Sequence, residues 1–203
     1  MSATRSAAGE PGTRERLIAA MTDALRRRGL HGIGLTELLQ AAGAPKGVLY
    51  HHFPGGKTEL AIAAIDTVVD RMGASLDRLL ANTPDPMTAM RLWIRGATER
   101  LRDTGFEAGC PLASVALEST PDDKALREAL ARAFARMRDR IAQGLLAAGM
   151  PPAQAAGVAA LLVAAYEGGL LQARVAHSIE PIQSVTDTLL ALLPGSPTQE
   201  HRP

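Results

Sequence analysis

Apolar residues recur at intervals of three and four along most of this chain, which is the spacing of one face of a helix. The first such segment begins at Thr13, carries Leu17, Met21 and Leu25 on its apolar face, and closes at 26–29. Glycine, proline and aspartate separate the later segments, and no alternating strand pattern competes with them. The pattern predicts an all-α protein. The later expected helices are 58–81, 87–103, 112–119, 122–148, 152–177 and 181–193.

Residues 35–57, LTELLQAAGAPKGVLYHHFPGGK, predict two short helices at a tight turn. Leu38 and Leu39 give the first of them an apolar face. Gly43 stands where a left-handed cap ends a helix, and Pro45 pre-sets φ for the next helix start. The second helix is expected to run over Lys46–His52.

The composition of this second short helix is unusual for a core helix. Val48, Leu49 and Phe53 can pack inward. The other positions form a basic and aromatic face without a carboxylate: Lys46, Gly47, Tyr50, His51 and His52. Such a face suits a DNA groove.

The same residues resemble the TetR family of transcriptional regulators, whose recognition segment reads Lys-Gly-x-Leu-Tyr-x-His-Phe. Here 46–53 read KGVLYHHF, and the resemblance covers about 13–70. Two departures occur: Ala44-Pro45 replaces a common capping serine, and Gly55-Gly56 lengthens the link to the next helix. Together with the sequence GCPL at 109–112, these departures resemble the LmrA/YxaF-like subgroup.

This resemblance implies an N-terminal three-helix helix-turn-helix domain at 13–60 and a helical ligand-binding and dimerisation domain at 61–193, with flexible tails at 1–12 and 194–203. It implies a homodimeric repressor that binds a palindromic operator in double-stranded DNA and is released by a small apolar or aromatic inducer. An interaction protein of the same fold without operator binding is the alternative, and a helical-bundle enzyme is a remote third possibility.

The resemblance also assigns roles at the DNA. Tyr50, His52 and Lys57 would hold phosphates, and Lys57 would be helped by the N-terminus of the helix that it begins. Thr36, Lys46 and Gly47 would face bases. The full set of expected DNA-contacting residues is Thr36, Pro45, Lys46, Gly47, Val48, Tyr50, His51, His52 and Lys57.

Charge is distributed unevenly along the chain. The 203 residues carry a net charge of +1, but the first sixty hold eight Arg and Lys against five Asp and Glu. The remainder holds fourteen against sixteen. A basic N-terminal part is what a nucleic-acid contact needs, although three charges alone are a weak signal.

Several features indicate a cytoplasmic protein without a membrane partner. Cys110 is the only cysteine, so no internal disulfide is possible and a reducing compartment is indicated. The first ten residues lack the apolar core of a signal peptide. The apolar run at 155–166 is shorter than the roughly 20 residues of a spanning helix.

A stripe of small residues runs along the expected helix at 152–177. Ala160, Ala164 and Gly168 are four residues apart, so another helix can approach closely. Packing within the chain is one interpretation. The family resemblance favours a four-helix bundle between two copies, built from this helix and 181–193. The expected interface residues are Ala160, Leu161, Ala164, Gly168, Leu171 and Leu189.

The larger or chemically distinctive residues of the C-terminal part are candidates for the inducer site, because most of their neighbours are Ala, Gly or Leu. They are Met90, Trp93, Phe106, Cys110, Leu117, Met137, Tyr166 and Glu167. A mostly apolar cavity with a few polar groups is the usual form of a small-molecule site. Core packing is the alternative for each of them.

No constellation of catalytic or metal-binding residues is recognisable. The chain has no HExxH, CxxC or GxGxxG motif. His51 and His52 are adjacent, so on a helix they point about 100° apart and cannot share one metal ion. Glu118 and Glu167 are isolated carboxylates on apolar helices, each more typical of a capped or partly exposed charge than of a general base. We expect no catalytic residue, metal or cofactor.

Overall fold

The computed structural model describes residues 12–192, which form nine helices without a strand. The tails expected at 1–12 and 194–203 lie outside this range, apart from Gly12. The helices are α1 (Thr13–Arg28), α2 (Leu35–Ala41), α3 (Lys46–His52), α4 (Gly56–Asn82), α5 (Pro86–Asp103), α6 (Pro111–Glu118), α7 (Lys124–Ala147), α8 (Pro152–Ala176) and α9 (Glu180–Ala191). The predicted fold class is confirmed, and the helix ends differ from the expected ones by a few residues.

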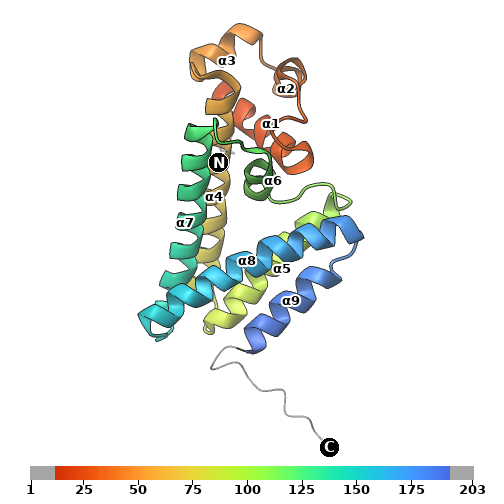
Figure 1. Cartoon of the computed structure of the whole chain (residues 1–203). Coiled ribbons are helices and arrows are strands. Elements are labelled where there is room, and N and C mark those ends of the chain that lie inside the picture. Colours follow the sequence, from red (N-terminus) through yellow and green to blue (C-terminus); the bar gives the residue numbers. More distant parts are fainter. Residues whose placement is uncertain (1–11, 193–203) are drawn as a thin grey trace, which may run out of the picture.

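Helices α1, α2 and α3 form the N-terminal helix-turn-helix domain at one end of the molecule (Figure 1). Their shared core is apolar and includes the fully buried Leu17, Leu38 and Leu49. Gly43 has the left-handed φ of 57° expected at the turn. The Ala44 amide donates a hydrogen bond of 2.9 Å to the Leu39 carbonyl. The turn chemistry therefore orients α3 as the sequence predicts.

The long helix α4 runs from the helix-turn-helix domain to the far end of the molecule (Figure 1). It packs against α1 at one end and against α5 and α7 along its length. Leu60, Ile65 and Leu76 lie on its buried face. On its outer side, Arg136 of α7 is ion-paired with Asp66 at 2.5 Å and Asp70 at 3.0 Å. One continuous helix therefore joins the two ends of the protein.

The C-terminal domain is made of long helices that cross one another. Helix α7 lies beside α4, whereas α5, α8 and α9 run across the lower part of both, and α6 lies between α1 and α8 (Figure 1). Helix α8 packs closely on α9, because a Cβ at Gly169 would lie only 2.9 Å from the Ile182 Cα. Helix α8 is also long and apolar enough to cross a membrane, but 44% of its most apolar window is buried inside the chain.

Candidate functional site

The exposed face of α3 presents the side chains that the sequence assigns to DNA. Lys46, Gly47 and His51 are exposed, Tyr50 is 49% exposed, and Thr36 is exposed on α2. Nothing lies within 4 Å of the position that a Cβ on Gly47 would take, and the first turn of α3 contains no acidic residue. A nucleic-acid backbone can therefore approach this end of α3 without meeting a protein atom or a carboxylate at these positions.

The remaining predicted residues border this face. Pro45 is the N-cap residue in extended conformation, with φ −68° and ψ 151°, and Val48 and His52 are half-buried. His52 packs edge-on against His51 at a ring-centroid distance of 5.1 Å. Arg14 of α1, which sequence reasoning missed, lies over the Phe53 ring at 5.3 Å. It adds an exposed cation beside the end of α3, and only the tertiary packing of α1 reveals it.

Lys57 does not extend away from the protein as a phosphate ligand would. Its Nζ donates hydrogen bonds of 2.6 Å to the carbonyl oxygens of both Leu30 and Ile33. Burial is the main cause that lowers the pKa of this ammonium group, and Glu118 acts in the opposite direction. The role assigned to Lys57 therefore changes from holding DNA to holding the loop between α1 and α2, because two of its three donors are occupied within the chain.

The C-terminal end of α1 is connected to the C-terminal domain through backbone groups. The Gly109 amide donates to the Arg26 carbonyl at 3.0 Å, and Arg174 Nη2 donates to the Arg27 carbonyl at 2.7 Å. Glu118 Oε2 accepts the amides of Leu30 at 2.5 Å and His31 at 3.1 Å. Glu118 is thus a carboxylate held by two backbone amides, in line with the capped charge that the sequence favours over a general base.

Gly29 is required at this junction for two reasons. Its backbone φ angle is 73°, a value that residues with a side chain rarely adopt. A Cβ there would lie 1.9 Å from Glu118 Oε1. The close approach of α6 to the end of α1 therefore depends on glycine at this position.

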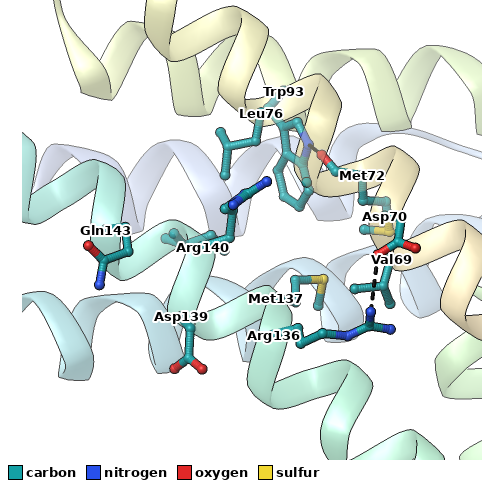
Figure 2. A pocket seen from close by; sticks show the side chains of 12 residues that line it. Val69, Asp70, Met72, Leu76, Trp93, Arg136, Met137, Asp139, Arg140 and Gln143 are labelled. Atoms are coloured by element: carbon teal, nitrogen blue, oxygen red, sulfur yellow. Dashed lines mark hydrogen bonds and ion pairs between the residues drawn. The ribbon is translucent and has the colours of Figure 1, made fainter.

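Two of the eight candidate inducer residues line a cavity of about 400 Å³ between α4, α5 and α7. Trp93 enters it from α5 and Met137 from α7, next to Val69, Met72 and Leu76 of α4 (Figure 2). Trp93 Nε1 donates to the Met72 carbonyl at 3.2 Å, which fixes the indole ring. Arg136 and Arg140 border the cavity but are ion-paired with acids of α4. This cavity therefore has an apolar wall, and the charges of the two arginines at its rim are neutralised by their ion pairs.

Cys110, Leu117 and Glu167 line a second, crevice-like cavity of about 230 Å³ between α6, α8 and the end of α1. The Cys110 thiol donates to Glu167 Oε1 at 3.1 Å, and Glu167 Oε2 is buried without a partner among the described residues. Burial raises the pKa of Glu167 to about 7, against a smaller lowering by the Cys110 hydrogen bond. Burial likewise raises the pKa of Cys110 well above its usual range, so this thiol is a weak nucleophile.

The eight candidates do not surround one shared space, so the expectation of a single inducer site that includes all of them is wrong. Phe106 packs on His177 at a ring distance of 5.7 Å and lines neither cavity, while Leu117 is 76% exposed at the rim of the second. Met90 is buried in the core near Gly144. Tyr166 contacts Trp93 at a ring distance of 5.5 Å but lines a third cavity. These residues are dispersed because they come from four helices with different facing directions and from the segment between α5 and α6.

The small-residue stripe of α8 faces outward. Ala160 and Ala164 are exposed, and nothing lies within 4 Å of a Cβ position on Gly168. Leu161 and Leu171 on the same side are 57% and 51% exposed. Packing of this stripe within the chain is therefore wrong. Leu189 differs from the others because it is half-buried against the core.

The sequence matches two family profiles over most of its length. Residues 17–64 match the profile described as bacterial regulatory proteins of the tetR family. Residues 86–188 match the profile described as the C-terminal domain of LmrA/YxaF-like transcriptional regulators. The two matches fall on the helix-turn-helix domain and on the helical C-terminal domain.

Individual proteins agree with these profiles. An uncharacterized HTH-type transcriptional regulator of Mycobacterium tuberculosis is 34% identical over 90% of this chain and 94% of its own. The HTH-type transcriptional regulator LmrA of Bacillus subtilis is 27% identical over 89% of this chain and 96% of its own. The crystal structure of a regulatory protein TetR from Rhodobacter sphaeroides superposes with a TM-score of 0.77 at 28% identity, covering 88% of this chain and 97% of that one. The chain therefore belongs to the TetR family, with an LmrA/YxaF-like C-terminal domain, and is a DNA-binding transcriptional regulator and not an enzyme.

Proposed function

We propose that this regulator is a repressor that binds a palindromic operator as a homodimer and is released by a small apolar or aromatic molecule. The observation that carries the proposal is the open, acid-free face of α3. Lys46 donates to a base edge, most simply guanine, while Gly47 permits close approach of the backbone. Tyr50 and His52 hold phosphates, and Thr36, Pro45, Val48 and His51 border the same contact.

The exposed apolar face of α8 supports the dimer. A soluble protein seldom leaves such a face uncovered, and small residues allow a second helix to approach closely. Two-fold pairing through α8 and α9 would present two copies of α3 to successive major grooves, about 34 Å apart. In this arrangement the apolar side of α8 contacts a second copy and not a membrane, and the protein acts in the cytoplasm.

Coupling between ligand and operator requires an element that both sites affect. Helix α4 meets this requirement, because it borders the 400 Å³ cavity and also packs against α1. We place the division between the domains at 60, within α4, so that 13–60 bind DNA and 61–193 bind the ligand and the second copy. Trp93 gives this proposal a direct signal, because a ligand in its cavity changes the fluorescence of the only tryptophan.

Labelled DNA from the regions flanking the regulator's own gene tests the proposal. We expect one fragment with an inverted repeat to bind more tightly than the others, with an affinity that falls steeply with salt. Lys46→Ala should reduce the preference for that fragment by about 1–3 kcal/mol. Arg95→Ala, a distant exposed arginine on α5, is the matched control and should bind as the wild type does. Equal binding of all fragments, or an unchanged preference in Lys46→Ala, would contradict the proposal.

A further inference from the structure

A cavity of about 190 Å³ lies where the end of α1 meets α4, α5, α6 and α8. Its apolar wall includes Val68 and Leu170, and its polar lining includes Arg26, Arg100 and Tyr166. Arg26 belongs to the last turn of α1, whereas Arg100 belongs to α5 and Tyr166 to α8. The cavity therefore has walls from both domains.

Neither arginine has an ion-pair partner within residues 12–192. Other arginines do: Arg27 is paired with Asp23 and Glu107, and Arg136 of α7 with two aspartates of α4. Asp103 lines the same cavity but is exposed and forms no ion pair with either arginine. Burial, followed by repulsion from Arg100, lowers the pKa of Arg26. The half-buried Arg26 and the exposed Arg100 thus face one space, and the Asp103 carboxylate that also lines it is paired with neither.

Tyr166 adds a third donor to this lining. Its side chain is buried, and burial raises the pKa of the phenol well above its usual range, so the hydroxyl keeps its proton. That hydroxyl makes no hydrogen bond to any residue in the described part of the chain, and both Arg26 and Arg100 act electrostatically on it. Two guanidinium groups and a phenol offer donors and little acceptor capacity, and a carboxylate supplies the missing acceptors.

We propose that this cavity binds a small organic acid, with its carboxylate between Arg26 and Arg100 and its apolar body against Val68, Met72 and Leu170. A bound carboxylate replaces a repulsion between α1 and α5 with two attractions, so it draws the end of the DNA-binding domain toward α5. This cavity is distinct from the one beside Trp93, so the acid would act on DNA binding through α1 and α5, and that effect rests on the proposed repressor function.

The second cavity provides an internal contrast, because its lining holds the carboxyl groups of Glu118 and Glu167 beside Arg27, Arg28 and Arg174. One Glu167 oxygen has no partner among the described residues, and with a pKa of about 7 this carboxyl would attract a cation only above neutral pH. Three probes of nearly the same size therefore distinguish the two cavities: benzoate, benzyl alcohol and benzylamine. They share a phenyl ring and a one-carbon link and differ in the charge and the hydrogen-bonding capacity of the polar group.

Calorimetric titration of the free protein with each probe tests the inference. We expect benzoate to bind at least about tenfold more tightly than benzyl alcohol, which is the effect of a charged hydrogen-bonding pair. Arg100→Gln and Arg26→Gln should each remove most of that preference. Arg102→Gln, on the same helix but lining a different groove, should keep it. The melting temperature of each variant without ligand verifies folding, and we expect no decrease for Arg100→Gln because a repulsion is removed.

Equal binding of benzoate and benzyl alcohol would overturn the inference, as would unchanged benzoate binding in both arginine variants. Preferential binding of benzylamine would also overturn it and would point to Glu167. The same titration in the presence of the operator fragment separates the two proposals. Benzoate binding that leaves DNA affinity unchanged supports the carboxylate site and contradicts release by this ligand. Binding of the operator fragment by a protein that does not bind benzoate supports the proposed regulator and contradicts the carboxylate site.

Discussion

Arg174 of α8 donates a 2.7 Å hydrogen bond to the backbone carbonyl of Arg27 at the end of α1, across 147 positions of sequence. The helix with the exposed apolar face therefore holds the first helix of the DNA-binding domain directly. A change in the position of α8 can reach α1 through this bond as well as through α4. The connection involves a charged donor and an end-of-helix carbonyl, a pairing that the helix dipole favours.

Replacing Arg174 with alanine should loosen this connection. We expect the free energy of unfolding to fall by about 1–3 kcal/mol, because a carbonyl oxygen loses a charged donor. Hydrogen exchange at the neighbouring Gly109 amide, which donates to the Arg26 carbonyl, should become faster. Arg127→Ala, which removes an exposed side chain from the Pro121 carbonyl, is the control. Equal exchange rates in wild type and Arg174→Ala would contradict the role of this bond.

Lys57→Met should lower stability without changing the salt dependence of DNA binding. The ammonium group holds the Leu30 and Ile33 carbonyls, so its loss should cost about 1–3 kcal/mol. Removing a phosphate contact would instead reduce the slope of log K against log salt by about 1. Arg14→Ala, which removes the exposed cation near α3, is the variant expected to reduce the slope. The two variants thus separate a structural lysine from a DNA-contacting arginine.

Gly168 and Gly169 should respond differently to substitution although they are adjacent. Gly168→Leu adds a side chain to open space, so the monomer should stay folded while dimer formation weakens by about 1–3 kcal/mol through overpacking. Gly169→Leu would place a side chain against Ile182 and Val185 of α9 and should destabilise the monomer itself. Analytical ultracentrifugation and urea unfolding of both variants measure the two effects. A wild type that is monomeric at micromolar concentration would contradict the dimer.

The stability of the protein should fall as pH rises toward neutrality because of Glu167. The folded carboxyl keeps its proton up to about pH 7, whereas the ordinary value is 4.5, so the folded state binds more protons between these two values. Stability is thus lost as pH rises from 4.5 to 7, and the full shift corresponds to about 3 kcal/mol. Glu167→Gln should be more stable than wild type at pH 8 and comparable near pH 4.5. Unfolding in urea across this range tests the sign, with the exposed Glu180→Gln as control.

Local signals in the sequence were sufficient to predict the helices and the exposed, acid-free face of α3. The turn at Gly43 and the helix start at Pro45 depend on neighbouring residues only, and so does the absence of acids on α3. The small-residue stripe also predicted a face for a second helix, but the sequence did not distinguish packing within the chain from packing between copies.

Long-range contacts explain what the sequence did not reveal. Lys57 contacts carbonyls 24 and 27 positions earlier, and no residue near Lys57 indicates that these oxygens are accessible. The pairing of Arg26 with Arg100 across a cavity depends on where α5 crosses α1. Large side chains in the C-terminal part marked possible cavity walls, but their distribution over several cavities follows from helix directions that no local pattern encodes.

The connection at the end of α1 is made largely to backbone atoms: the carbonyls of Arg26 and Arg27, the amides of Leu30 and His31, and the carbonyls that Lys57 holds. Such a connection tolerates side-chain replacement at most of these positions but not a change in chain length. One residue inserted after Arg28 would lengthen this non-helical segment by up to about 3.8 Å and displace the amides of Leu30 and His31 relative to the end of α1. The segment between α1 and α2 must therefore keep its length. Gly29 must also stay a glycine, whereas the residues beside it can change in type as long as their number does not.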